Sequence, residues 1–303
     1  MAELRTLTRR GLLSLAAGWP AAYAATLAAE WRRMASGTDG VVGVAAMNLG
    51  SGQHLSLRGD DRFPMASVCK LPIAMQILAL VDAGKLSLRS RIEVLPADVT
   101  LSYSDIGHRW ARQKQFPLDE LLELMIARSD NTAVETLYRI GGGAPAIMTR
   151  LRGWGLDGIR IDRTEKQCGL DAGRDMRAFI ADPRDTATPD GTVRLLARLF
   201  RGELLAAAST AHLIRIMETT ATGPGRIKGL LPPGTVVAHK TGTAGTRGGL
   251  NGGTNDVGVI TLPQGAGQLA LAIYVKGSTH SLPQREAVMA RIARAAFDSA
   301  RLE

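Results

Sequence analysis

The sequence predicts an α+β fold in which one sheet is assembled from both ends of the chain. Strand-like stretches rich in apolar and β-branched residues lie near one end, at Val41 to Asn48 and Gln53 to Leu57, and near the other, at Thr235 to Thr243. The chain between them, from Ser67 to roughly Thr220, has a mostly helical pattern. Strands on both sides of a helical insert are expected to share a sheet, with a functional site at its seam with the helices.

Helices are also expected at the two ends of the chain. Thr26 to Met34 precedes the first strand, and a last helix begins at Ser281. The 303 residues allow one or two domains, and the sequence contains no internal repeat and no Ser/Pro-rich linker.

The chain is basic, with a formal net charge of +9. Such a surplus can indicate affinity for nucleic acid or membranes, but the arginines are dispersed along helices such as Arg285 to Arg301 and form no stripe with aromatic residues. Solvated helix faces therefore account for the charge, and no nucleic-acid partner is expected. The five histidines fit no metal-binding spacing, so no metal and no other cofactor is expected.

A serine and a lysine lie one turn apart at the start of a strongly apolar helix. The segment is Ser67-Val68-Cys69-Lys70, followed by the apolar run 71–80. Residues three apart share a helix face, and serine becomes a nucleophile when a neighbouring base takes its proton, which a buried lysine with a lowered pKa can do. The alternative is a capping serine followed by a solvated lysine, which the apolar flank disfavours.

Two further short motifs follow in order. Ser129-Asp130-Asn131 lies between helical runs at Pro117 to Ala127 and Thr132 to Tyr138, so it is interpreted as a polar joint between packed helices. Lys240-Thr241-Gly242 lies in the strand-like stretch that ends at Thr243.

With these three motifs the chain resembles the class A serine β-lactamases, whose pattern is S-x-x-K, S-D-N and K-T-G. The resemblance covers nearly all of the chain after the first two dozen residues. Asp162-Arg163-Thr164-Glu165 and Pro183 to Pro189 are similar to the start and the end of the family's Ω loop, which a pair between Arg163 and Asp185 would close. Thr254 to Ile260 is similar to a strand of an extended-spectrum branch of the family.

The resemblance implies a fold of the β-lactamase/transpeptidase type. Its five-stranded antiparallel sheet, flanked by terminal helices, packs against an all-α lobe. We expect the α/β lobe to comprise residues 25–60 plus 218–303, and the all-α lobe to comprise residues 61–217 with an Ω loop at about 162–186. A monomer is expected.

The resemblance also implies catalytic roles in opening a β-lactam ring. Ser67 would attack and be acylated, and Ser129 would pass a proton to the leaving nitrogen. Lys70 would act as base or proton relay, and Glu165, acting through a water, is the competing base for the serine proton.

Substrate contacts are implied at six further positions. Asn131 would hold Lys70 and the substrate's side-chain amide, Lys240 would keep the field positive near Ser129, and backbone N–H groups of Ser67 and Thr243 would form the oxyanion hole. Thr241 and Thr243 are expected to hydrogen-bond the substrate carboxylate, and Arg226 is expected to dock it, with Arg247 as the competing arginine. Tyr103 is expected at the pocket mouth. The alternative for Tyr103 is a tyrosine side chain packed within its loop.

Glu165 separates the candidate functions. A β-lactamase needs a carboxylate that activates water against the acyl-enzyme. A penicillin-binding DD-peptidase or sensor shares the three motifs but lacks that carboxylate. An inactive binding protein on the same fold is the third candidate. The resemblance therefore favours hydrolysis of penicillins and cephalosporins, which confers antibiotic resistance.

The chain departs from the family in the Ω loop. Gly169 occupies a position where the family often has an asparagine that helps to hold the hydrolytic water, and Asp171 or the backbone could substitute for it. The loop is also several residues longer than usual, and it is expected either to widen the pocket or to bulge into solvent.

The first residues resemble an export leader. Arg9-Arg10 precedes a short apolar run and the small-x-small site Ala22-Tyr23-Ala24, so residues 1–24 are predicted to be a twin-arginine signal peptide and the mature protein to be periplasmic without stable membrane association. A retained amphipathic helix is the alternative. Cys69 is expected to be a small buried apolar residue, and Cys69 and Cys168 could be free or joined by a disulfide.

Overall fold

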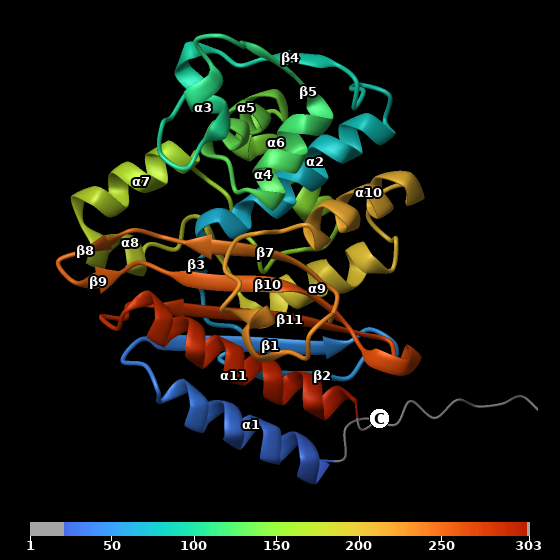
Figure 1. Ribbon diagram of the computed structural model, residues 1–303, viewed down its shortest axis with the longest axis vertical. Coiled ribbons are helices and arrows are strands. Elements are labelled where there is room, and N and C mark those ends of the chain that lie inside the picture. Colours follow the sequence, from blue (N-terminus) through green and yellow to red (C-terminus); the bar gives the residue numbers. More distant parts are fainter. Residues whose placement is uncertain (1–20, 302–303) are drawn as a thin grey trace, which may run out of the picture.

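The computed structural model describes residues 21–301 and has the predicted α+β architecture. Five antiparallel strands form one sheet in the order β2-β1-β11-β10-β7 (Figure 1). They are β1 (Val41–Asn48), β2 (His54–Leu57), β7 (Val237–Thr243), β10 (Thr254–Thr261) and β11 (Gln268–Lys276). Strands from the two ends of the chain meet where β1 pairs with β11, so the predicted shared sheet is confirmed.

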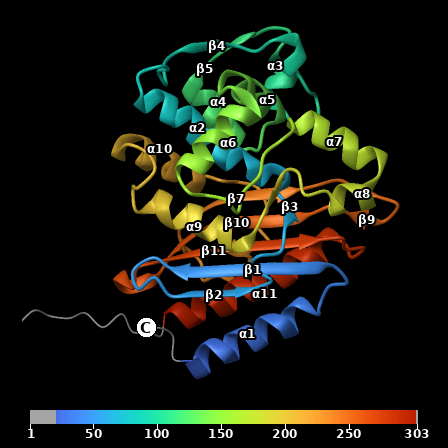
Figure 2. The ribbon, with the colours of Figure 1, turned by 180° about the vertical axis from the view of Figure 1, so that it is seen from behind.

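Two terminal helices cover one face of this sheet. They are α1 (Ala21–Ala35) and α11 (Leu282–Ala300), and they lie side by side in both views (Figures 1 and 2). Trp31 of α1 and Phe297 of α11 are buried in a core with Val44 and Ile273 of the sheet. Ser281 begins α11 as predicted, through a capping box with Gln284.

The opposite face of the sheet carries the helical part of the chain (Figure 2). Its helices are α2 (Lys70–Asp82), α3 (Asp105–Arg109), α4 (Leu118–Ala127), α5 (Asn131–Ile140), α6 (Gly143–Gly153), α7 (Glu165–Arg174), α8 (Met176–Ala181), α9 (Pro189–Phe200) and α10 (Ala207–Glu218). Short 3-10 turns are η1 (Ala66–Cys69), η2 (Pro96–Asp98), η3 (Ile227–Leu230) and η4 (Pro263–Gly265). Three two-stranded ribbons complete the fold: β3 (Phe63–Pro64) with β6 (Thr186–Ala187), β4 (Arg91–Glu93) with β5 (Gln115–Pro117), and β8 (Thr246–Arg247) with β9 (Leu250–Asn251).

Helix α2 runs through the middle of the helical part. It is buried from Lys70 to Ala79, as its nearly continuous apolar sequence requires. Pro72 is tolerated because it lies in the first turn, where backbone N–H groups have no partner within the helix. The η1 turn that precedes α2 therefore places the Ser67-Val68-Cys69-Lys70 motif at the seam between α2 and the sheet.

The start of α1 overlaps the predicted leader. Residues 1–20 lie outside the described part of the chain, and α1 begins at Ala21, earlier than the expected Thr26. Within residues 21–301, no helix is both long and apolar enough to cross a bilayer.

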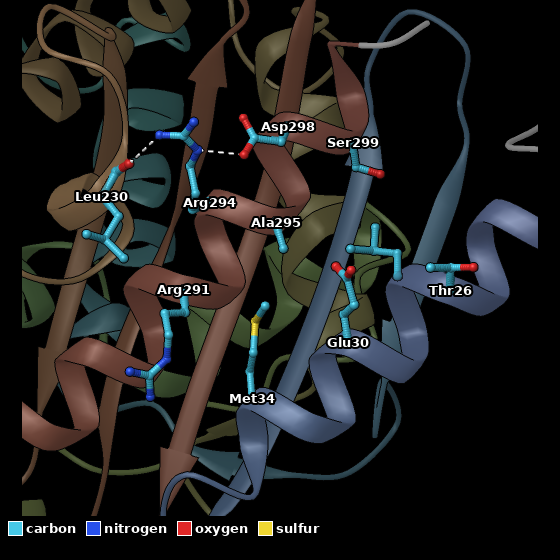
Figure 3. A pocket seen from close by; sticks show the side chains of 10 residues that line it. Thr26, Glu30, Met34, Leu230, Arg291, Arg294, Ala295, Asp298 and Ser299 are labelled. Carbon is cyan, nitrogen blue, oxygen red and sulfur yellow. Dashed lines mark hydrogen bonds and ion pairs between the residues drawn. The ribbon is translucent and has the colours of Figure 1, made fainter.

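A groove of about 410 Å³ lies between the two terminal helices (Figure 3). Its rim includes Arg294, which pairs with Asp298 at 2.6 Å and donates to the carbonyl oxygen of Leu230. This groove is on the face of the sheet away from the helical part, so it is separate from the seam where the motifs meet.

Candidate active site

Ser67 lies in the η1 turn, one helical turn before Lys70. The preceding Ala66 has a φ of 46°, so the chain turns sharply before the serine. Gly242 of β7 passes so close to η1 that a Cβ at that position would lie 2.5 Å from the carbonyl oxygen of Met65. Only glycine allows this approach, which explains the third position of the Lys-Thr-Gly motif. Ser67 itself is 9% exposed.

Lys70 is fully buried and holds the second motif in place. Its Nζ donates to Asn131 Oδ1 at 2.6 Å and to the carbonyl oxygen of Ser129 at 2.7 Å, and it lies 3.2 Å from Ser129 Oγ. Burial lowers the pKa of Lys70, against the opposing charge of Glu165. A neutral amine has two N–H groups, which match the two carbonyl oxygens and leave its lone pair free to accept a proton.

The Ser-Asp-Asn segment is the predicted polar joint between α4 and α5. Ser129 has a φ of 61°, a conformation that needs support from its surroundings. Asp130 supplies this support, because its carboxylate caps α5 through Ala133 N at 2.8 Å and accepts from Ser104 Oγ and Ile106 N. The strained serine is therefore held between two loops with its hydroxyl towards Lys70.

Lys240 approaches the same hydroxyl from the sheet. It is fully buried on β7, and its Nζ lies 3.1 Å from Ser129 Oγ and 2.9 Å from the carbonyl oxygen of Thr241. Burial, followed by the charge of Lys70, lowers the pKa of Lys240 to about 7. Ser129 Oγ thus lies between two amines, an arrangement suited to moving a proton.

Glu165 is the first residue of α7, which Thr164 caps through Gln167 N. One oxygen of Glu165 lies 3.7 Å from Cys69 Sγ, on the turn that carries Ser67. Glu135, which was not predicted, accepts from Lys166 N at 2.8 Å and so anchors the start of α7. Its only sequence indication is its place four residues after Asn131, on the same face of α5.

The Ω loop closes through Arg163, as predicted. Its guanidinium pairs with Asp185 at 2.6 Å, with Asp171 at 2.7 Å and with Asp182 at 3.2 Å, and its side chain is 6% exposed. The loop contains helices α7 and α8, which Asp175 separates by capping α8. Asp171, which could have replaced the asparagine missing at position 169, is thus engaged by Arg163.

Arg226 is buried beneath the end of β7. It donates to Glu286 at 3.0 Å, to the carbonyl oxygens of Gly242 and Asn255 at 3.0 and 2.8 Å, and to Thr243 Oγ1 at 2.7 Å. Because a guanidinium only donates, the Thr243 hydroxyl keeps its own proton for another acceptor. Arg226 therefore acts on the site through Thr243. Glu286, on α11, could not have been found from local sequence.

The neighbouring polar groups complete this end of the site. Thr241 Oγ1 lies 2.5 Å from Thr222 Oγ1, a partner that was not predicted. Arg247, the competing docking arginine, is exposed on β8 and does not line the cavity at the seam.

A cavity of about 500 Å³ opens at the seam. Its lining comes from Ala66 just before Ser67, the loop around Tyr103, helices α5 and α7, and the end of β7. Glu165 and Asn131 line it, and so does Gly169, where a Cβ would meet no atom within 4 Å. The Ω loop therefore forms a wall of the cavity.

The two cysteines are free thiols. Cys69 is half-buried and packs against the hydrophobic core, and its thiol also lies 3.7 Å from a carboxylate oxygen of Glu165. Burial and the charge of Glu165 raise the pKa of Cys69, which keeps the thiol protonated. Among residues 21–301, no group of three or more His, Cys, Asp or Glu side chains is arranged to hold a metal ion.

These groups define a serine acyl-transferring hydrolase. Ser67 and Lys70 lie one helical turn apart, Ser129 Oγ lies between the amines of Lys70 and Lys240, and the carboxylate of Glu165 lies on a facing loop.

Comparisons with known proteins give the family. The family model described as "Beta-lactamase enzyme family" matches residues 26–300. The extended-spectrum β-lactamase PER-1 of Pseudomonas aeruginosa is 34% identical over 86% of this chain and 83% of its own length. β-Lactamase VEB-1 of the same species is 32% identical over 84% of this chain and 83% of its own length. A β-lactamase structure from Chitinophaga pinensis superimposes with a TM-score of 0.85 and 34% identity, and covers 91% of this chain and 99% of its own.

The chain therefore belongs to the β-lactamase enzyme family and is a class A serine β-lactamase. The predicted fold class, enzyme class and family are confirmed, and the relatives support β-lactam hydrolysis and antibiotic resistance rather than the DD-peptidase alternative.

Proposed function

We propose that this β-lactamase hydrolyses penicillins and cephalosporins through an ester on Ser67, with Lys70 as the base of acylation and Glu165 as the base of deacylation. The observation that carries the proposal is the chain of contacts from Lys70 through Ser129 Oγ to Lys240. Lys70, at one end of this chain, lies one helical turn after Ser67.

In the first step, Ser67 Oγ attacks the β-lactam carbonyl carbon and the C–N bond of the ring breaks. The serine proton passes to the free lone pair of Lys70 and then, through Ser129, to the leaving nitrogen. Lys240 keeps this path positive, and Thr241 and Thr243 donate to the substrate carboxylate. Backbone N–H groups of Ser67 and Thr243 stabilise the oxyanion.

In the second step, Glu165 takes a proton from a water that attacks the ester carbonyl, and Ser67 is released with its proton restored. Asn131 orients Lys70 throughout, through its 2.6 Å hydrogen bond. Steady hydrolysis of nitrocefin by the purified chain tests the activity. A single burst would indicate a protein that acylates without turnover, and no reaction would indicate an inactive binding protein.

We also propose that the enzyme works as a monomer in the periplasm after removal of residues 1–24. The paired Arg9-Arg10 followed by an apolar run supports export by the twin-arginine route. N-terminal sequencing of the exported protein tests this, and an intact Met1 would contradict it.

We expect acylation to slow in acid as Lys70 becomes protonated. Below the lysine pKa the rate should fall about tenfold for each pH unit. The Glu165→Gln variant isolates this step. Because the Glu165 charge raises the Lys70 pKa, its removal should move the slow-down to lower pH. Stopped-flow acylation rates measure the profile. Loss of acylation at every pH in this variant would instead make Glu165 the acylating base and Lys70 a relay.

We expect Gly169→Asn to accelerate deacylation. The new side chain enters open space beside Glu165, on the same face of α7, where its amide can hold the hydrolytic water. The rate should rise severalfold for a penicillin without a bulky side chain, as measured by single-turnover kinetics. Gly173→Asn is the matched control, because a Cβ at Gly173 also meets no atom within 4 Å, one turn further along α7. Equal effects of both variants would remove the water-holding explanation.

A further inference from the structure

The carboxylate of Glu165 is held by a hydrogen bond from the turn that faces it. Cys69 Sγ donates to Glu165 Oε2 at 3.7 Å, and it is the one donor that reaches this carboxylate in the described part of the chain. The backbone on either side of Glu165 is fixed separately, because Thr164 caps α7 and Lys166 N donates to Glu135. A glutamate side chain has several freely rotating bonds, so the thiol contact determines where the carboxylate points.

The thiol of Cys69 has the properties that this contact requires. Burial, followed by the charge of Glu165, raises the pKa of Cys69. The thiol therefore keeps its proton and acts as the donor. Because S–H is a weak donor, it can orient the carboxylate without greatly reducing the affinity of Glu165 for a proton, whereas a strong donor would favour the charged form.

The contact also ties the carboxylate to the turn that carries Ser67. Cys69 ends η1, two residues after Ser67. Glu165 lines the active-site cavity, and with Oε2 held by the thiol its other oxygen is left to accept a proton from water. The carboxylate is thus held at a set place relative to an ester on Ser67.

We propose that Cys69 is a positioning residue for deacylation, whose thiol orients the Glu165 carboxylate towards the water that attacks the ester on Ser67. The inference rests on the proposed function, because it requires Glu165 to be the base of deacylation. Cys69 acts only through Glu165, so the acylation step does not depend on its thiol.

Two substitutions separate the donor from the volume of the side chain. Cys69→Val keeps an apolar side chain of similar size but removes the donor, and deacylation should slow about fivefold, as expected for loss of one weak hydrogen bond. Cys69→Ser keeps a donor and should restore most of the rate. Single-turnover kinetics with benzylpenicillin measure both steps, and the acylation rate should stay unchanged. Wild-type deacylation in Cys69→Val, or equal losses in both variants, would overturn the proposal.

Two further variants exclude a merely structural effect. Cys168→Val is the matched control, because Cys168 is the other free thiol and lies on α7 one turn after Glu165. Its deacylation rate should equal that of the wild type. Cys69→Val combined with Glu165→Gln should hydrolyse the ester as slowly as Glu165→Gln alone, since no base remains to be oriented. A further fivefold loss in the combined variant would overturn the proposal.

Infrared spectroscopy tests the contact without catalysis. The chain has two cysteines, so in Cys168→Val the remaining S–H stretching band belongs to Cys69. Adding Glu165→Gln should move this band to higher frequency, because a neutral amide oxygen accepts more weakly than a carboxylate. An unshifted band would overturn the positioning contact alone. Undiminished penicillin turnover in Glu165→Gln would instead contradict the proposed function.

Discussion

Replacement of Glu165 by glutamine is expected to stop the enzyme at the acyl-enzyme. Glutamine keeps the shape of the side chain but cannot take a proton from water, whereas Ser67, Lys70 and Ser129 remain in place. Deacylation should slow by about 10³-fold, within the range for loss of a general base. Mass spectrometry of the variant with benzylpenicillin should show the intact protein carrying one covalently bound penicillin.

The kinetic form of this result is a stoichiometric burst of nitrocefin hydrolysis followed by a very slow steady rate. Glu218→Gln, at an exposed position at the end of α10, is the matched control and should behave as the wild type. Undiminished turnover with no trapped adduct in Glu165→Gln would assign deacylation to another group, and the assignment of Glu165 as the base would be lost.

Replacement of Arg163 by methionine is expected to destabilise the Ω loop more than any other single change within it. Methionine keeps much of the side-chain volume but leaves Asp185 without its cation, and it leaves Asp171 and Asp182 with the half-exposed Arg184 in place of the buried Arg163. The side chains of these aspartates are 19%, 15% and 9% exposed. Loss of one partner from a buried ion pair costs about 3–5 kcal/mol.

Hydrogen exchange of α7 and α8 measures this loss directly, and thermal unfolding shows how much of it reaches the whole protein. Deacylation should slow as well, because Glu165 lies two residues after Arg163. Arg160→Met is the matched control, since the Arg160 side chain is 41% exposed and pairs with Asp162 alone. Only a small change in hydrogen exchange and in thermal unfolding is therefore expected for this variant. Equal protection of α7 in both variants would show that the three-carboxylate cluster does not hold the loop.

The sequence was sufficient for features that depend on short, local patterns. The strand Val41 to Asn48 has the predicted bounds, and the last helix starts at the predicted Ser281, where the structure shows a capping box. The three motifs meet at one site because each lies at the end of a regular element, where the chain turns towards the seam. The Arg163–Asp185 pair could be predicted because the sequence at both ends of the loop resembles the family's Ω loop.

Long-range partners could not be predicted in the same way. Glu286 of α11 contacts Arg226, and Thr222 of a loop contacts Thr241. The two residues of each pair are far apart in the sequence, so no local pattern indicates that they meet. The thiol of Cys69 faces Glu165 because α7 folds back over η1, an approach fixed by packing rather than by propensity. The conformation of the Ω loop also depends on tertiary contacts, and residues of its helices α7 and α8 line the cavity.

The pairing of β1 with β11 sets the order in which the molecule can be built. The central strand β11 and its neighbour β1 come from opposite ends of the chain, and β11 is synthesised almost last. The sheet cannot close on the ribosome before the C-terminal strands have emerged, and closure of so long a loop makes folding intrinsically slow. Until the sheet has closed, no tertiary contact holds the segment of Ser67 against the segment of Lys240. The enzyme therefore becomes active only once its entire chain has been made.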